Sequence, residues 1–569
     1  MKIFYCLIVI IVLTTLAYCS VPSNEFTRYD DDINIYENPY FYPINLDNTL
    51  HFWKHTYEHL YIPVSYTAWA ALGRLSNFFA RSQEGQVFNP HIYHSANLVV
   101  HVLNALVVFV LLLHLVKNHW AACAGALLFA LHPVQVETVA WASGFRDVLS
   151  GLFSLVAIWC FIVYATGDPR NEKSGCPPRR YYVYALCFFL CAMLAKPSAV
   201  VIPAVLFILA YIIFTKPVKQ SIKEALPFCV IAVPLVVTTK LSQPDAQMSF
   251  APSFVQWPLI LGDTLTFYVS KLVWPLMLGP DYGRTPLKVL ESSWVYVTGT
   301  VPFALLGVVL WRYRRPLAMA AIGIFLIAVL PVSGVVPFNF QNISTTADRY
   351  LYVAMFGPSL AVAWGLSVYK GRALLYLCFC GILLLGMRTF FQATYWQNSR
   401  SLFEHALTVN PNSSIAHNNL GVEFYKQRRY EEAFKHFKRA VALNPGHDAA
   451  YVNLGVLAAM KNDQGAALEY YSKALERNPA HGRAHNNMAN AYVKTGRYEE
   501  AMKHYNKALS LVPELAPGIY FNMGVLYEQQ GQTKEALDYY VKAFRLNPNF
   551  GEAQENHQRL MQQGVGRQP

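Results

Sequence analysis

Long apolar runs, separated by short basic or polar segments, occupy roughly the first two thirds of the chain. An α-helix needs about twenty residues to cross a hydrocarbon layer of about 30 Å. The pattern predicts membrane-spanning helices at residues 93–116, 120–138, 147–166, 181–196, 198–215, 226–240, 293–311, 317–332, 350–369 and 373–390. Composition agrees, since 54% of the residues are hydrophobic and only 14% are charged, where soluble domains carry about 25%.

The first apolar run, from Ile3 to Tyr18, is a further spanning helix or a signal segment. Basic residues cluster in short loops, which marks the cytoplasmic side; they are Lys117, Arg170, Lys173, Arg179, Arg180, Lys216, Lys219, Lys223, Arg312, Arg314, Arg315, Lys370 and Arg372. The basic loops all fall on the cytoplasmic side only if the stretch 257–278 does not cross the membrane. About eleven spans result, and residues 21–92 share an outward face with the C-terminal region. The piece from Leu50 to Phe79 is amphipathic and predicts one interfacial helix.

The C-terminal region is periodic. Pro411, Pro445, Pro479, Pro513 and Pro548 are spaced by 34, 34, 34 and 35 residues, which is the tetratricopeptide period. Small residues recur where two helices of a repeat cross, and one large aromatic residue recurs between the paired alanines of the second helix; the set is Gly421, Gly455, Ala489, Gly524, Ala433, Ala440, Ala467, Ala474, Ala501, Ala508, Ala536, Ala543, Phe437, Tyr471, Tyr505 and Tyr540. Such repeats stack into a superhelix with a concave binding face.

The predicted fold is therefore all-α, a polytopic bundle of transmembrane helices followed by a repeat superhelix. Its parts are an N-terminal helix or signal segment at 1–20, an outward-facing loop with an acidic motif at 21–92, a polytopic membrane domain at 93–390 and about 4.5 repeats at 391–569. The net charge of +12 comes largely from loops that flank apolar runs, so we expect no nucleic-acid partner. The ten cysteines show no metal-binding spacing.

Three adjacent carboxylates, Asp30, Asp31 and Asp32, stand in an aromatic-rich loop beside the membrane. Mutual repulsion and partial desolvation should raise the pKa of at least one of them. Such a group can accept a proton from a hydroxyl near neutral pH. The alternatives are a solvated acidic turn or an N-cap for the next helix.

An asparagine recurs at one position of the repeats, as Asn419, Asn453, Asn487 and Asn522. An amide side chain donates to and accepts from a peptide bond at once. The ladder is therefore suited to binding an extended polypeptide whatever its sequence. The alternative is that this asparagine is only a common feature of the repeat.

Four stretches carry a resemblance to a known family: Tyr29-Asp30-Asp31, Leu131 to Ser150, Ala195-Lys196-Pro197 and Ala347 to Tyr352. With the repeat tail, the chain resembles the transmembrane and tetratricopeptide repeat-containing (TMTC) proteins of glycosyltransferase superfamily C. The loop at 241–292 is shorter than in the eukaryotic members, which places the chain nearer the bacterial-type branch. The resemblance implies transfer of a sugar, mannose in the eukaryotic branch, from a polyprenyl-phosphate donor to protein hydroxyls.

The family's paired acidic positions fall on Asp30 and Asp31, which the resemblance implies as the catalytic base, and Glu137 is a further catalytic candidate. Departure of the lipid phosphate requires cations, and guanidinium groups bind phosphate bidentately. The candidates for this role are Arg349 and Arg146, followed by His132 and Lys196. Local ion pairing or interfacial anchoring would also explain Arg146 and Arg349. We expect no resident cofactor, and the sequence leaves open a divalent cation held by Glu137 with an aspartate.

The implied partners are a membrane lipid donor and a protein or peptide acceptor on the repeats. The expected location is the bacterial inner membrane with the repeats in the periplasm, or the endoplasmic reticulum membrane with the repeats in the lumen. The main alternative is a non-catalytic, membrane-anchored scaffold that binds proteins through its repeats. A transporter is disfavoured because the ionisable residues cluster near the outward ends of the predicted spans.

Overall fold

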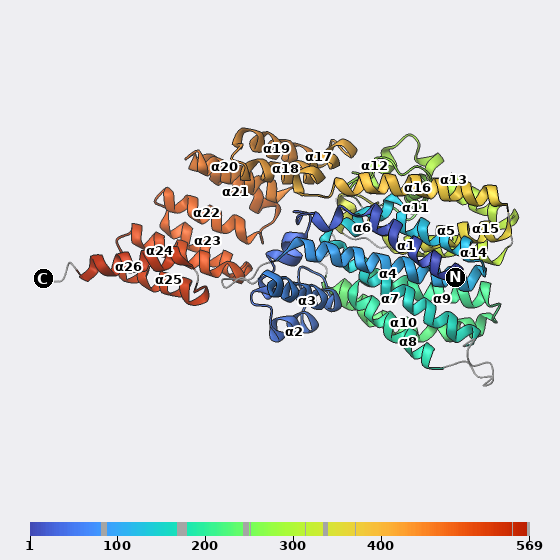
Figure 1. Ribbon diagram of the computed structural model, residues 1–569. Coiled ribbons are helices and arrows are strands. Elements are labelled where there is room, and N and C mark those ends of the chain that lie inside the picture. The colour runs from blue at the N-terminus through green and yellow to red at the C-terminus, as the bar shows by residue number, and fades with distance from the viewer. Residues whose placement is uncertain are drawn as a thin grey trace. The chain divides into compact units, whose positions relative to one another are not determined.

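A computed structural model describes residues 1–80, 88–167, 179–242, 250, 252–312, 315–333, 339–369, 371–548 and 550–565. Its elements are helices and short helical turns, apart from one isolated bridge between Tyr57 and Leu60. The predicted all-α class is therefore confirmed. The chain forms two compact units, Met1–Pro411 and Asn412–Pro569 (Figure 1). Four of the basic loop residues, Arg170, Lys173, Arg314 and Lys370, lie outside the described residues.

The first unit contains seventeen described α-helices: α1 Lys2–Ala17, α2 Leu46–Lys54, α3 Pro63–Ala80, α4 Pro90–Val116, α5 His119–Leu131, α6 Val136–Ala140, α7 Phe145–Thr166, α8 Arg179–Ala195, α9 Ile202–Ile208, α10 Val218–Ser242, α11 Trp257–Val273, α12 Pro286–Glu291, α13 Val295–Arg312, α14 Pro316–Val329, α15 Phe356–Val368, α16 Arg372–Thr394 and α17 Ser399–Val409. Helix α5 lies at the centre and contacts α1, α4, α15 and α16. It is rich in alanine, and small residues let neighbouring helices approach closely. A Cβ on Gly125 would lie 2.6 Å from the backbone oxygen of Ser359 on α15.

Among the described residues, five helical stretches are long and apolar enough to cross a membrane: Lys2–Ser23, Pro90–Val116, Ala142–Thr166, Val218–Ser242 and Arg372–Thr394. A sixth exists if His119–Leu131 and Pro133–Ala140, bent by 48°, form one span. Shorter apolar helices at Pro197–Ile213, Val295–Val309, Pro316–Val332 and Phe356–Val368 coincide with further predicted spans. The prediction of about eleven spans therefore stays unconfirmed.

Proline accounts for two departures from the predicted helices. The stretch 120–138 bends at Pro133, because proline lacks an N–H and disfavours a helical residue before it. The prediction of one helix from Leu50 to Phe79 is wrong: α2 ends at Lys54, and α3 begins at Pro63, where proline is favoured as the first helical residue.

The predicted span 350–369 is also shorter than expected, because its helix α15 begins only at Phe356. The residues before it form a separate helical turn, η10 (Asp348–Leu351). This turn buries the side chains of Asp348 and Arg349. The two charged residues that precede this predicted span are therefore buried within the first unit.

The second unit contains nine described helices: α18 Ser414–Lys426, α19 Tyr430–Leu443, α20 Asp448–Met460, α21 Gln464–Arg477, α22 Gly482–Lys494, α23 Tyr498–Leu511, α24 Ala516–Gln529, α25 Thr533–Leu546 and α26 Gly551–Val565. They pack as the pairs α18–α19, α20–α21, α22–α23 and α24–α25, and α26 packs on α25. A Cβ on Gly455 would lie 2.4 Å from the Tyr471 ring. The two helices of this repeat therefore approach closely at Gly455, as predicted for the small residues at the crossing.

Candidate functional site

Asp31 anchors the acidic loop. Its Oδ2 accepts hydrogen bonds from the backbone N–H (2.8 Å) and the hydroxyl (2.9 Å) of Thr27, and its Oδ1 accepts one from the backbone N–H of Ser143 (2.8 Å). The side chain is completely buried, and burial raises the pKa of the carboxyl to about 7 although the hydrogen bonds lower it. Asp31 stands at the N-cap position of η2 (Asp32–Tyr36) without capping it. It fastens the loop to η5 (Ala142–Gly144) instead.

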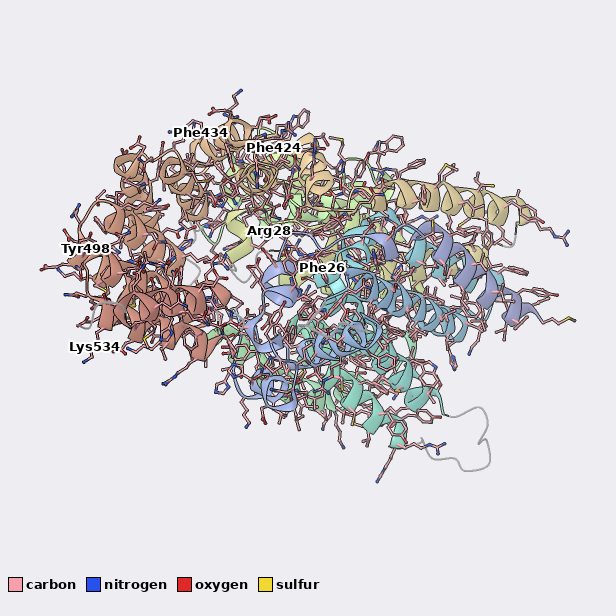
Figure 2. The ribbon with its side chains drawn as sticks, turned by 60° about the vertical axis from the view of Figure 1, so that its left-hand side comes forward. Phe26, Arg28, Phe424, Phe434, Tyr498 and Lys534 are labelled. Carbon is pink, nitrogen blue, oxygen red and sulfur yellow. The ribbon has the colours of Figure 1, made fainter. Side chains whose placement is uncertain are left out.

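Asp30 points the other way. Its φ of 77° lies in the left-handed region, which aspartate enters more readily than most residues. Its side chain is 52% exposed, and its Oδ2 lies 3.7 Å from Nη2 of Arg146. Figure 2 labels Phe26 and Arg28 on the segment that leads to this residue. The remaining carboxylate, Asp32, is largely buried, and burial raises its pKa. The expected raised pKa is thus present in the triplet, with burial rather than repulsion as the main cause.

A chain of ion pairs leads from Asp30 into the unit. Arg146, in the first turn of α7, lies between Asp30 and Asp147, with its Nε 4.0 Å from Asp147 Oδ2. The other oxygen of Asp147 pairs with the ammonium group of Lys196, which directly follows α8. The local Arg146–Asp147 pair considered from the sequence therefore exists, as one part of a longer network.

Glu137 is bound to Arg349. One of its oxygens accepts a hydrogen bond from the backbone N–H of Arg349 at 3.0 Å, and the other pairs with its guanidinium group. Both side chains are almost fully buried. The guanidinium carbon also lies 4.3 Å from the ring centre of Phe340 and 5.8 Å from that of Trp141. Glu137 and these rings fix the position of Arg349.

Trp141 connects the two arginines, because its ring centre also lies 5.2 Å from the guanidinium carbon of Arg146. Next to Arg349, Asp348 is held by the hydroxyl of Tyr282, which lies 2.8 and 2.9 Å from its two oxygens. Burial and the charge of Glu137 raise the pKa of Asp348. The sequence reasoning missed Tyr282 and Trp141 as neighbours of the site, although Trp141 lies within the resembling stretch Leu131 to Ser150.

A cavity of about 60 Å³ lies at the inner end of the network. Its charged lining residues are Asp147, Lys196 and Arg349. The other lining residues are Ser150, Ser154, Ser198, Ala199, Val201, Ile202, Ala328, Pro331, Val332, Tyr350, Tyr352 and Val353. The structure thus brings two of the four predicted phosphate-binding residues to one cavity. Arg146 adjoins it through Asp147.

His132 is not among the residues that line this cavity. It is buried where α5 ends, its Nε2 lies 3.0 Å from the backbone oxygen of Leu272, and its Nδ1 accepts a hydrogen bond from the backbone N–H of Val134. Nδ1 therefore caps η4 (Pro133–Gln135) at the bend after α5, and Nε2 connects this bend to α11. Among the described residues, no group of three or more His, Cys, Asp or Glu side chains is arranged to hold a metal ion.

The asparagine ladder of the second unit is hydrogen-bonded between repeats. Asn453 donates to Asn418 at 2.9 Å, and Asn418 donates to Asn419 at 3.2 Å. The same arrangement recurs two repeats later, where Asn522 donates to Asn486 at 3.2 Å and Asn486 donates to Asn487 at 3.4 Å. The sequence reasoning missed Asn418 and Asn486, although the doublets Asn418-Asn419 and Asn486-Asn487 were a visible signal. These bonds hold the ladder amides in fixed orientations.

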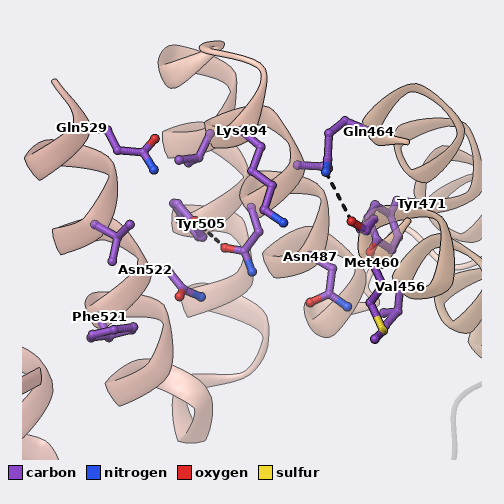
Figure 3. Close-up of a pocket in the computed structure, with 15 residues that line it drawn as sticks. Val456, Met460, Gln464, Tyr471, Asn487, Lys494, Tyr505, Phe521, Asn522 and Gln529 are labelled. Carbon is purple, nitrogen blue, oxygen red and sulfur yellow. Dashed lines mark hydrogen bonds between the residues drawn. The ribbon is translucent and has the colours of Figure 1, made fainter. Parts of the chain in front are cut away.

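A groove of about 410 Å³ lies next to this ladder (Figure 3). Asn487 and Asn522 line it, together with the apolar side chains of Val456, Met460 and Phe521. Further polar lining residues are Gln464, Asn490, Lys494 and Gln529. Amides beside an apolar wall can bind a peptide backbone and one of its apolar side chains at the same time. Figure 2 also labels Phe434, Tyr498 and Lys534 of this unit, which lie on α19, α23 and α25.

Family models of the repeat match the C-terminal part of the chain. Models described as tetratricopeptide repeat match residues 388–448, 419–481, 470–503 and 517–550, and one described as TPR repeat matches residues 489–531. The predicted repeat array is therefore confirmed. Among solved structures, MamA is 22% identical with a TM-score of 0.25 and covers 29% of this chain and 96% of its own. YrrB, titled a TPR protein with an unusual peptide-binding site, is 20% identical with a TM-score of 0.24 and covers 34% and 94%.

Three curated human relatives match over a longer part of the chain. Protein O-mannosyl-transferase TMTC3 of Homo sapiens is 25% identical over 395 residues, which cover 61% of this chain and 42% of that protein. Protein O-mannosyl-transferase TMTC4 of Homo sapiens is 25% identical over 357 residues, which cover 54% of this chain and 47% of that protein. Protein O-mannosyl-transferase TMTC1 of Homo sapiens is 26% identical over 409 residues, which cover 61% of this chain and 45% of that protein. The chain thus spans less than half the length of these relatives. The resemblance to TMTC proteins is confirmed.

The raised pKa of Asp31 predicts a pH-dependent stability. An unfolded aspartate has a pKa of about 3.9, and the folded value is about 7. Between these values the folded state keeps a proton that the unfolded state has released, so the contribution of Asp31 to stability falls as pH rises from about 4 to 7. It is constant outside this window.

We therefore expect the melting temperature of the wild type minus that of Asp31→Asn to decrease between pH 4.5 and pH 7 and to level off above it. Thermal unfolding of the detergent-solubilised proteins at several pH values would measure this difference. The variant Asp47→Asn, at an exposed carboxylate, is the control and should show no such trend. A difference for Asp31 that is flat or grows with pH would contradict the assignment.

Proposed function

We propose that this TMTC-like chain is a membrane glycosyltransferase that transfers a sugar, of O-mannosyl type, from a polyprenyl-phosphate donor to a hydroxyl of a protein. The observation that carries the proposal is the network Asp30–Arg146–Asp147–Lys196. Its outer end is an exposed carboxylate, and its inner end is a cavity lined by Lys196 and Arg349. A transfer of this kind needs a carboxylate that accepts a proton and cations that stabilise the leaving phosphate.

In this mechanism, Asp30 accepts the proton of the acceptor hydroxyl as its oxygen attacks the anomeric carbon of the sugar. The bond from that carbon to the phosphate oxygen breaks on the opposite face, so the configuration inverts. The negative charge that develops on the leaving lipid phosphate is stabilised by Lys196 and Arg349. Arg146 orients Asp30 from its position 3.7 Å away.

Asp31 and Glu137, both catalytic candidates from the sequence, are assigned as positioning residues. Asp31 has no exposed surface and uses both oxygens to bind Thr27 and Ser143. Glu137 uses both oxygens to bind Arg349. Neither carboxylate is accessible to an acceptor hydroxyl, whereas the half-exposed side chain of Asp30 is.

The acceptor is assigned to the second unit. The fixed amides of Asn419, Asn453, Asn487 and Asn522 bind the backbone of an extended protein segment, and the groove beside Asn487 and Asn522 takes one of its side chains. Binding through the backbone leaves hydroxyl side chains free to react. The expected location is an intracellular or bacterial inner membrane, with both the acidic loop and the repeats on the outward face.

The base is tested by Asp30→Asn, which preserves shape but cannot accept the proton. We expect the turnover number to fall at least ~100-fold, within the usual range for a general base. The measurement is transfer of radiolabelled mannose from polyprenyl-phosphate mannose to a protein acceptor in proteoliposomes. Asp47→Asn serves as the control. Full turnover in Asp30→Asn would remove Asp30 as the base, and an inactive wild type with intact acceptor binding would favour the scaffold.

The phosphate site is tested by Arg349→Lys. A lysine retains the charge but cannot form the two parallel bonds of a guanidinium group. We expect kcat/KM for the donor to fall by about tenfold or more, which corresponds to about 1.4 kcal/mol. The exposed Arg74→Lys is the matched control. Unchanged donor dependence would mean that Arg349 has only a structural role beside Glu137.

The acceptor site is tested by changing Asn419, Asn453, Asn487 and Asn522 together to alanine. The apparent KM for a protein acceptor should rise, and donor hydrolysis in the absence of acceptor should stay constant, because the ladder touches only the acceptor. Circular dichroism must first show that the repeats stay folded, since Asn453 and Asn522 bond to the preceding repeat. Asn506→Ala, at an exposed position on α23, is the control. A folded quadruple variant with unchanged KM would make the ladder a repeat feature only.

A further inference from the structure

A second polar cavity, of about 380 Å³, lies between α11, α12 and α13 in the first unit. Arg284 and Lys288 are its cationic lining residues, and Asp263 is its acidic one. Hydroxyl groups of Thr266, Ser270, Ser292 and Thr298 also line it. It shares no lining residue with the cavity of Lys196 and Arg349, and the proposed transfer does not use it.

The charge of this cavity favours an anion. One terminal nitrogen of Arg284 pairs with Asp263, whose side chain is almost buried. The Nε of Arg284 is buried and has no hydrogen-bond partner among the described residues. Lys288 is exposed, so one positive charge remains in excess. Hydroxyl groups and a guanidinium N–H are suitable donors for the oxygens of a phosphate group.

The polar cavity continues into an apolar one. Thr266 and Ser270 on α11 line both. The second cavity measures about 520 Å³ and is formed by residues of α11, α13, α14 and α15, among them Val269, Leu305 and Phe325. These helices carry labels in Figure 1. A headgroup-sized polar cavity joined to an apolar groove is complementary to an amphipathic molecule.

Two features of the helices explain why the groove is there. A Cβ on Gly262 of α11 would lie 1.9 Å from the backbone oxygen of Gly299, so α11 and α13 touch at this point. Beyond it, residues 265–273 and 301–309 line the groove instead of filling it. Trp294, which is 68% exposed, lines the polar cavity. Tryptophan is enriched at the level of lipid headgroups.

We propose that the two cavities form one binding site for an anionic membrane phospholipid, with its phosphate at Arg284 and Lys288 and an acyl chain in the groove between α11, α13, α14 and α15. The site is separate from the reaction. A bound lipid fills the apolar groove and holds α11 against α14 and α15. Because binding is measured without turnover, the proposal can fail or succeed independently of the glycosyltransferase function.

The test is native mass spectrometry of the purified full-length protein titrated with phosphatidylglycerol or with phosphatidylcholine of the same acyl chains. The wild type should bind phosphatidylglycerol more tightly by about tenfold, because the excess positive charge of the cavity attracts an anionic headgroup. Lys288→Glu should abolish this preference. Since Lys288 is exposed, the variant should fold. Lys219→Glu, at an exposed lysine of α10, carries the same charge change and should retain the preference.

A second variant tests the groove. Val269→Trp adds volume on the apolar side without changing charge, so this variant should bind both lipids more weakly. Its melting temperature should stay at or near that of the wild type. Equal binding of the two lipids by the wild type would overturn the proposal. The proposal would also be overturned if Lys219→Glu lost the preference for phosphatidylglycerol as fully as Lys288→Glu does.

The donor is distinguished by competition. Polyprenyl phosphate without a sugar should leave phosphatidylglycerol bound at equal concentration, and inorganic phosphate should not compete at that concentration. If polyprenyl phosphate displaces phosphatidylglycerol and loses its own affinity in Lys288→Glu, the cavity belongs to the donor and the proposal is wrong. If inorganic phosphate displaces the lipid, the site recognises a free anion and the groove has no part in binding.

Discussion

The geometry of the candidate active site depends on the three hydrogen bonds of one buried carboxylate, Asp31. Its bond to Ser143 connects positions 112 residues apart. Asp30 directly precedes Asp31, and Arg146 follows Ser143 by three residues. A single side chain therefore sets the distance between the exposed carboxylate and the guanidinium group beside it. An aspartate without these bonds would be costly to bury, so the loop and η5 are stable only when they are joined.

The same reasoning applies to the deeper charges. Arg349 and Glu137 are both almost fully buried, and burying either charge without the other would strongly destabilise the folded state. Together they satisfy each other, and the rings of Phe340 and Trp141 restrict the guanidinium group further. A cation held in this way undergoes little rearrangement when an anion arrives. Such preorganisation is what makes electrostatic stabilisation effective in a reaction.

The repeat unit could be predicted from the sequence nearly completely, for a local reason. Each repeat places a small residue of one helix against a large residue of the next, as Gly455 meets Tyr471. That contact lies within one period, so a pattern along the chain contains it. The bounds of the membrane helices were predicted less well. The bend at Pro133 and the separate turn before Phe356 depend on how neighbouring helices pack.

The site was predictable as a set of residues but not as a set of roles. Asp30 and Asp31 are adjacent and chemically identical, and only the packing of the loop, with the bond from the distant Ser143, distinguishes the buried Asp31 from the exposed Asp30. An imidazole could bind a phosphate, yet one nitrogen of His132 is used by the bend after α5 and the other by the backbone oxygen of Leu272 on α11. Lys196 directly follows α8 and Arg349 lies in the turn η10, and their meeting at one cavity is a property of the packed unit.

The pairing of every cation in the network also bears on selectivity. Lys196 is neutralised by Asp147, and Arg349 by Glu137, before any donor is present. A phosphate entering the cavity must therefore compete with a carboxylate for each cation, and a neutral lipid offers nothing in exchange. In return, the unit stays stable without a ligand, because no positive charge is left buried alone. In the proposed transfer, the lipid phosphate gains negative charge when the sugar leaves, and Asp147 is the neighbouring group that would oppose its tight binding. Under the proposed function, the carboxylates that stabilise the site without a ligand would thus also favour release of the spent donor.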